Sequence, residues 1–204
     1  MCFRKQFAVL FAVLAMFLLC SCSLPVQSEH ETAAVNSVPA ADGTLAVHFL
    51  DVGQGDSEFI ELPDGNTMLI DAGEREYGET VSEYISALGY SEITYLVATH
   101  PHSDHIGGLP AVFENFDVSN VYMPDATSSS QIYKTLLDSV EQENCSVIEA
   151  KNGVSVIQSE DLNAYFVAPC ESSYSDLNNY SAVLKLTYGG NSFLFTGDAE
   201  ELSE

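Results

Sequence analysis

The stretch Ala98-Thr99-His100-Pro101-His102-Ser103-Asp104-His105-Ile106-Gly107-Gly108 decides how this chain folds and what it can bind. Three of the five histidines in the chain fall within six positions of this stretch, together with one aspartate. The apolar, β-branched run before it, residues 93–98, predicts a buried strand, and residues 106–116 predict a helix with both glycines in its first turn. We therefore expect the four polar side chains on a strand-to-helix loop at the carboxyl end of a strand, where open α/β sheets bind ligands.

Imidazole and carboxylate donors at this spacing suit zinc or a similar divalent ion. His100 and His102, at alternate positions, can face one ion, while the adjacent Asp104 and His105 face a second. A two-metal site of this kind holds both the attacking and the leaving oxygen of a hydrolysis. Paired histidines are also common as hydrogen-bonded surface or core residues, but four ligand-type residues in six positions favour the metal site.

The same residues carry a resemblance to a known family. Residues 99–108 resemble the metal motif of the metallo-β-lactamase superfamily. Three further stretches resemble the soluble hydrolase domain of ComEC-type competence proteins: Phe49-Leu50-Asp51-Val52-Gly53-Gln54-Gly55-Asp56-Ser57, Leu69-Ile70-Asp71-Ala72-Gly73 and Phe195-Thr196-Gly197-Asp198. The resemblance implies an α+β fold of the αββα sandwich type. It also implies a hydrolase that uses two divalent ions, zinc or alternatively manganese, on a phosphodiester or other small-molecule substrate.

The resemblance assigns roles to residues outside the histidine loop. It implies that Asp198 bridges both ions, although aspartate is also a favoured helix N-cap. Asp104 is expected to orient the attacking water in addition to binding the second ion. Asp71 is expected to hold a histidine in place from outside the ligand shell. Asp56 borders the site in the same way, or is a turn residue beside glycine.

Two departures from the family pattern matter. β-Lactamase-type enzymes supply a third histidine to the first ion, but Asn178-Asn179-Tyr180-Ser181 occupies that region here, so β-lactam hydrolysis is not expected. Asn179 or Ser181 contacts a ligand or substrate, or the segment is only a loop before a hairpin. Family members also supply a last histidine from a further strand, whereas no histidine follows His105. Either the sequence is a fragment that lacks the last strand and helix of the sandwich, which is the simpler interpretation, or the protein has lost this ligand, strand and helix.

The first residues resemble an export signal. Residues 7–20 form an uncharged apolar run behind Arg4-Lys5, shorter than the roughly 20 residues of a membrane span but typical of a secretory signal. Leu19-Cys20-Ser21-Cys22 resembles a bacterial lipobox with Cys22 as the lipidated residue. We expect a lipoprotein signal peptide over 1–21, a flexible tether over 22–44 and the hydrolase domain over 45–204, anchored by lipid to the outer face of the cell membrane. A plain secreted protein and an uncleaved anchor are the alternatives.

The chain is strongly acidic, with a net charge of −24. Such a surface repels polyanions, so an extended nucleic-acid interface is not expected, although one phosphate ester can still bind at a cationic metal pair. Two rival functions stay open: hydrolysis of a cell-envelope ester, amide or choline phosphodiester, and a non-catalytic metal-binding surface module. Cys145 and Cys170 are expected as two buried thiols, although a disulfide is permitted outside the cytoplasm.

The remaining patterns predict short strands and two more helices. Strands are expected over 45–52, 57–62, 66–70, 118–123, 147–148, 154–156, 162–167, 180–188 and 192–195. Helices are expected over 77–88, with Val81, Tyr84, Ile85 and Leu88 as the apolar face, and over 128–143, with Ile132, Leu136, Leu137 and Val140. His48 is expected to be structural. Strands, then helices, then strands fit two packed sheets flanked by helices.

Overall fold

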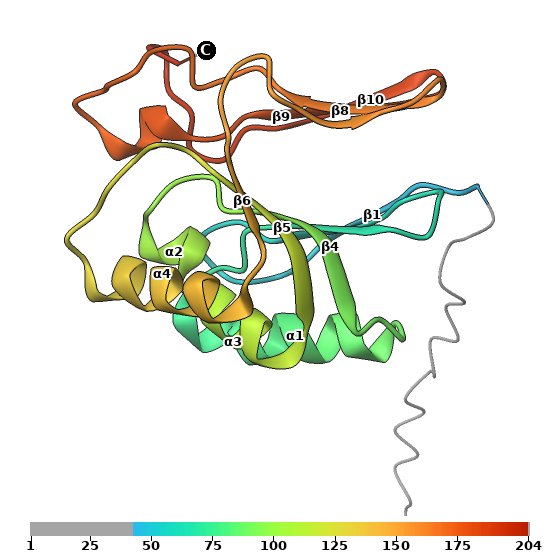
Figure 1. Cartoon of the computed structure of the whole chain (residues 1–204), viewed down its shortest axis with the longest axis horizontal. Helices are drawn as coiled ribbons and strands as arrows, with labels where there is room; N and C mark the ends of the chain where they lie inside the picture. The colour runs from blue at the N-terminus through green and yellow to red at the C-terminus, as the bar shows by residue number, and fades with distance from the viewer. Residues whose placement is uncertain (1–42, 204) are drawn as a thin grey trace, which may run out of the picture. The chain divides into compact units, whose positions relative to one another are not determined.

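The computed structural model describes residues 43–203 (Figure 1). These residues form two sheets. The first has the order β1 (Ala46–Phe49), β2 (Glu58–Glu61), β3 (Thr67–Ile70), β4 (Glu92–Val97), β5 (Asp117–Met123), β6 (Ser146–Glu149), and the second has the order β10 (Asn191–Phe195), β9 (Leu184–Tyr188), β8 (Leu162–Phe166), β7 (Ser155–Gln158). The helices are η1 (Arg75–Tyr77), α1 (Gly78–Ala87), α2 (Ser103–Ile106), α3 (Leu109–Asn115), α4 (Gln131–Glu143) and η2 (Leu177–Tyr180).

The first sheet changes from antiparallel to parallel pairing at β3. Strands β1, β2 and β3 pair antiparallel, whereas β3, β4, β5 and β6 pair parallel. Parallel neighbours need crossover connections, and the helices provide them: α1 between β3 and β4, α2 and α3 between β4 and β5, and α4 between β5 and β6. The loops at the carboxyl ends of β3 and β4 therefore come together at one edge of the sheet, which is where the histidine motif lies.

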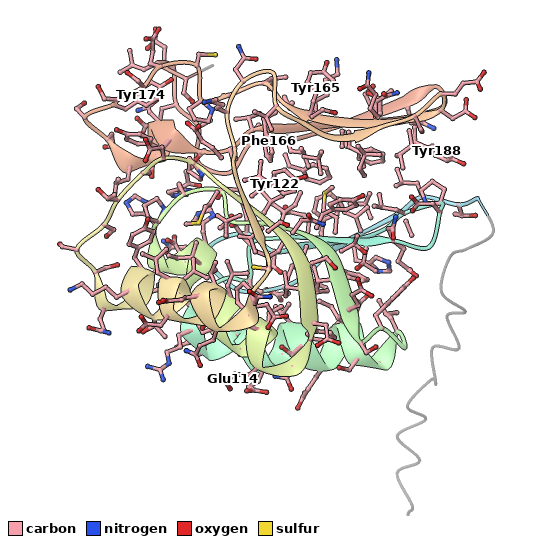
Figure 2. The ribbon with its side chains drawn as sticks, viewed as in Figure 1. Glu114, Tyr122, Tyr165, Phe166, Tyr174 and Tyr188 are labelled. Carbon is pink, nitrogen blue, oxygen red and sulfur yellow. The ribbon has the colours of Figure 1, made fainter. Side chains whose placement is uncertain are left out.

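The central strands are buried on both faces. On β3, Leu69 packs against the helices, and its neighbours Met68 and Ile70 pack against the second sheet. Figure 2 shows Tyr122 of β5 and Phe166 of β8 facing each other between the two sheets, with ring centroids 5.7 Å apart. Alternate side chains thus belong to two separate cores, as the twofold period of a strand requires.

The predicted mixed α+β architecture of two packed sheets is confirmed, with α1, α3 and α4 together covering one face of the first sheet (Figure 1). Within residues 43–203, no α-helix covers the outer face of the second sheet, where Leu194 is 58% exposed. The described part is therefore an αββ arrangement.

The helix predicted over 106–116 was wrong in its extent. The chain forms two short helices instead, α2 and α3, which are separated at Gly107 and Gly108. The amide of Gly108 donates to Gly73 O at 3.0 Å, and a Cβ on Gly108 would lie 2.2 Å from Ala72 O. Close packing against the loop after β3 thus interrupts the helix, and Asp104 and His105 lie on α2 rather than on an open loop.

Other sequence predictions also need correction. Tyr84 and Leu137 are each 39% exposed, so they are not part of the buried helix faces. Tyr84 instead contacts His48, whose two ring nitrogens lie 2.9 Å from the Tyr84 hydroxyl and from a Glu61 carboxylate oxygen, a structural role as expected. On α4 the buried aromatic is Tyr133, which donates its hydroxyl to Ala126 O at 2.8 Å.

The two cysteines of the domain are both free thiols, with Cys145 half-buried and Cys170 exposed. The expected pair of buried thiols is therefore wrong for Cys170. The expected signal peptide, the lipidated Cys22 and nearly all of the tether lie outside the described residues. Across residues 43–203, no helix combines the length and apolar character that crossing a bilayer requires.

Candidate metal centre

The candidate ligands converge from both sheets at one end of the sandwich. His100, His102 and His105 follow β4, Asp71 follows β3, and Asp198 follows β10 of the other sheet. His100 and His105 are each 1% exposed, whereas 43% of the Asp198 side chain is exposed. The buried histidines His100 and His105 therefore lie opposite the partly exposed carboxylate of Asp198.

The first group of donors is His100, His102 and Asp198. His100 Nε2 lies 3.0 Å from His102 Nδ1 and 3.9 Å from Asp198 Oδ2. One ligand atom of each residue lies within 4.8 Å of those of the other two. A tetrahedral ion with metal–nitrogen distances near 2.0–2.1 Å would separate its ligand atoms by roughly 3.4 Å, so this spacing suits one divalent ion.

The second group of donors is Asp56, His105 and Asp198. Asp198 Oδ1 lies 3.3 Å from His105 Nε2, while its other oxygen faces His100. Asp198 thus presents one oxygen to each group, an arrangement in which a carboxylate can bridge two ions.

Asp56 and Asp104 both lie at the centre, but only Asp56 belongs to a donor group. Asp104 lies outside both donor groups, and its Oδ2 accepts a hydrogen bond from Gln54 Nε2 at 3.2 Å. Asp56, expected at the border of the site, joins the second group instead. The loop that carries Gln54 and Asp56 packs closely on α2, since a Cβ on Gly55 would lie 1.8 Å from Asp104 O.

Asp71 contacts His105 from outside the two donor groups. It is fully buried and accepts hydrogen bonds from Thr99 N at 2.9 Å and from Thr99 Oγ1 at 2.5 Å. His105 Nδ1 lies 2.8 Å from Asp71 Oδ2, so this nitrogen carries the proton and Nε2 is left to face the site. Asp71 also adopts a left-handed φ of 53°, which aspartate tolerates better than most residues.

Ser181 contacts His100 at Nδ1, the ring nitrogen that faces away from the other donors. His100 Nδ1 lies 3.1 Å from Thr99 Oγ1 and 3.3 Å from Ser181 Oγ, so Nε2 faces the other donors. Asn179 is 1% exposed on η2 and donates from Nδ2 to Glu200 Oε2 at 3.0 Å. Both residues therefore pack around the centre rather than form an open loop.

The chemistry of these residues fits a pair of divalent ions. His105 Nε2 is buried and has no hydrogen-bond partner, a costly state for a polar atom unless a ligand satisfies it. Two nitrogen–oxygen donor groups meet there and share one carboxylate. An ion in each group would satisfy the buried nitrogen and offset the repulsion between Asp56 and Asp198.

The charges of the centre shift several pKa values. Burial lowers the pKa of His105, but its hydrogen bond to Asp71 and the charges of Asp71, Asp198 and Asp56 outweigh burial and raise it to about 9. Burial, helped by repulsion from His105 and His102, lowers the pKa of His100 to about 3. Burial and then the charges of Asp56 and Asp71 raise the pKa of Glu58 to about 8.

These shifts predict how the stability of the metal-free chain depends on pH. For His105 and for Glu58 the folded state keeps a proton that the unfolded state loses, so the His105 contribution to stability decreases as pH rises from 6.5 to about 9 and the Glu58 contribution as pH rises from 4.5 to about 8. We expect the urea midpoint, measured with EDTA, to fall from pH 6.5 to about 8, where the two ranges overlap. Glu58→Gln should make the fall shallower, because glutamine does not titrate. A midpoint that stays constant or rises would contradict the prediction.

Three residues of the centre were not predicted from the sequence: Thr99, Gln54 and Glu200. Thr99 adjoins the histidine motif and Gln54 lies between two glycines, so their neighbours were the available signal. Glu200 has no such signal, because it is one of many acidic residues in an acidic chain.

Comparison with known proteins agrees with the fold. Residues 50–130 match the family model described as metallo-beta-lactamase superfamily. The chain is 29% identical to ComE operon protein 3 of Bacillus subtilis (strain 168) over 81% of its own length, and it spans about a quarter (24%) of that relative. A HARLDQ-motif metallo-beta-lactamase of Cronobacter sakazakii superposes with a TM-score of 0.52 at 17% identity, covering 76% of this chain and 56% of that one. A mutant of that enzyme superposes with a TM-score of 0.51 at 18% identity, covering 73% of this chain and 60% of the mutant chain.

Proposed function

Because the chain carries a metallo-β-lactamase domain, the fold of a superfamily of metal-dependent hydrolases, we propose that it hydrolyses phosphodiester bonds with two divalent ions. The observation that carries this proposal is that Asp198 offers one oxygen to each of two donor groups. His100 and His102 would hold one ion, His105 and Asp56 the other, and Asp198 both.

The ions, when bound, would polarise a phosphoryl oxygen and lower the pKa of a water to near 7. The chain's own residues orient the ligands: Asp71 keeps the proton on His105 Nδ1, and Thr99 and Ser181 turn His100 Nε2 towards the centre. Although burial raises the pKa of Asp104, the hydrogen bond from Gln54 and other favourable interactions outweigh it and lower the pKa. Asp104 is therefore negatively charged at neutral pH and can orient a water or accept its proton.

Charge supports a short substrate rather than a long polyanion. Among residues 43–203 the strong bases are only Arg75, Lys134, Lys151 and Lys185, too few for an extended row of phosphate contacts. We propose zinc, or alternatively manganese, as the metal, because the donors are imidazoles and carboxylates. The signal-like residues 1–22 support a lipid anchor and a site of action outside the cytoplasm.

Metal removal tests this function. We expect the purified chain, supplied with Zn²⁺ or Mn²⁺, to release p-nitrophenol from bis-p-nitrophenyl phosphate, EDTA to abolish the release, and either ion to restore it. A variant that carries both His100→Ala and His102→Ala is the control for contaminating enzymes. If the unmodified chain releases no more product than this control with either ion, the proposed activity is wrong.

A further inference from the structure

The two donor groups depend on how the segment after β10 is held. Asp198 comes from the second sheet, whereas the histidines come from the first. Within residues 196–203 the backbone hydrogen bonds are local turns, Ala199 N to Thr196 O at 3.2 Å and Ser203 N to Glu200 O at 2.8 Å. These turns shape the segment but do not fix it against the histidines.

Glu200 ties this segment to η2. Its Oε1 accepts a hydrogen bond from Asn178 Nδ2 at 3.3 Å, and its Oε2 accepts one from Asn179 Nδ2 at 3.0 Å. Asn179 is 1% exposed, so the second of these bonds is buried at its asparagine end, whereas Glu200 itself is exposed. A carboxylate suits this place because two amide donors need two acceptor oxygens.

The helix that Glu200 holds leads directly to the first donor group. Ser181 follows η2, is fully buried and lies 3.3 Å from His100 Nδ1, and the next amide, Ala182 N, donates to Thr99 O at 2.9 Å. Gly197, the residue before Asp198, packs closely against Thr99 and Ser181. A Cβ on Gly197 would lie 3.1 Å from the Thr99 side chain and 3.3 Å from Ser181 Oγ. The segments that carry Asp198 and Ser181 are thus packed side by side, and Glu200 joins them.

We propose that Glu200 is a positioning residue of the metal centre: through Asn178 and Asn179 it fixes Asp198 relative to His100. This inference rests on the proposed function in that the spacing it sets is the spacing of the metal ligands. Glu200 itself does not belong to either donor group.

The asparagine oxygens indicate which variant restores the contact. Asn178 Oδ1 and Asn179 Oδ1 are buried without a hydrogen-bond partner. In Glu200→Gln, one asparagine can flip its side-chain amide so that its oxygen accepts a hydrogen bond from the amide nitrogen of the new glutamine. The side-chain oxygen of this glutamine can still accept a hydrogen bond from the other asparagine. Glu200→Gln should therefore keep most of the positioning, whereas Glu200→Ala removes it.

The first experiment uses the metal-free chain and records the imidazole ¹⁵N signals of His100. We expect Glu200→Ala to shift them, Glu200→Gln to restore them largely, and Glu201→Ala, a change at the exposed neighbouring residue, to leave them unchanged. Thermal unfolding of each variant verifies that it is folded. Wild-type His100 signals in a folded Glu200→Ala chain would overturn the proposal, whether or not the protein is a phosphodiesterase.

The second experiment measures Zn²⁺ affinity by calorimetry. We expect Glu200→Ala to weaken binding by about 10- to 100-fold, the usual effect of losing a group that orients ligands. Asn179→Ala combined with Glu200→Ala should cost little more than Glu200→Ala alone, because both remove the same contact. Unchanged affinity in Glu200→Ala, or fully additive losses, would overturn the proposal. Ion binding by the unmodified chain without hydrolysis would instead overturn the proposed function and leave this inference standing.

Discussion

We expect the Asp198→Asn chain to hold at most one divalent ion and its kcat/KM for bis-p-nitrophenyl phosphate to fall at least about 100-fold, the upper range for losing only an outer ligand contact. The reason is that Asp198 faces both donor groups, with its two oxygens 3.9 Å from His100 Nε2 and 3.3 Å from His105 Nε2. Asparagine keeps the size of the side chain but has one oxygen and no charge, so it cannot serve two cations.

Metal content after dialysis and steady-state kinetics together measure this effect. Asp161→Asn is the matched control, because it makes the same chemical change at an exposed residue just before β8, outside both donor groups. This control should bind two ions and keep full activity. An Asp198→Asn chain that retains two ions at wild-type affinity would show that the carboxylate does not bridge.

Replacing Asp71 with alanine has the largest expected effect on stability, about 3–5 kcal/mol in the free energy of unfolding. Asp71 is fully buried and pairs with His105, whose buried charge would keep only the more exposed carboxylates of Asp198 and Asp56 as partners. Thr99 N and Thr99 Oγ1 also lose their acceptor. The left-handed backbone at Asp71 adds roughly 1–2 kcal/mol for alanine.

Asn144→Ala measures the cost of alanine in a left-handed backbone conformation separately from the loss of the Asp71 side-chain contacts. Asn144 has a φ of 57°, close to the 53° of Asp71, but it is an exposed residue at the end of α4. Denaturant unfolding in EDTA should therefore show a loss of about 1–2 kcal/mol for Asn144→Ala and a clearly greater loss for Asp71→Ala. Equal losses would mean that the bonds from Asp71 to His105 and Thr99 add nothing to stability.

Local patterns were sufficient for the strands and for the chemistry of the histidine motif. The apolar run before His100 forms β4, and Pro63-Asp64-Gly65 joins β2 to β3 as an antiparallel hairpin. His100 and His102 lie together because they are two residues apart in the chain, a distance that tertiary packing changes little. The roles of the aspartates after β3 and β10 were implied by the resemblance to the metallo-β-lactamase superfamily, since a strand end beside a glycine is also a common turn arrangement.

The tertiary structure decided which side chains meet. Gly107 and Gly108 divide one predicted helix into two, because the loop after β3 packs where their side chains would be. Gln54 contacts Asp104, and Asp56 lies with His105 and Asp198, since the loop after β1 packs against α2. Glu200 meets Asn178 and Asn179 across more than 20 residues of chain. Periodicity and turn chemistry act over a few residues and determine the elements, whereas contacts between loops of different sheets depend on how those sheets pack.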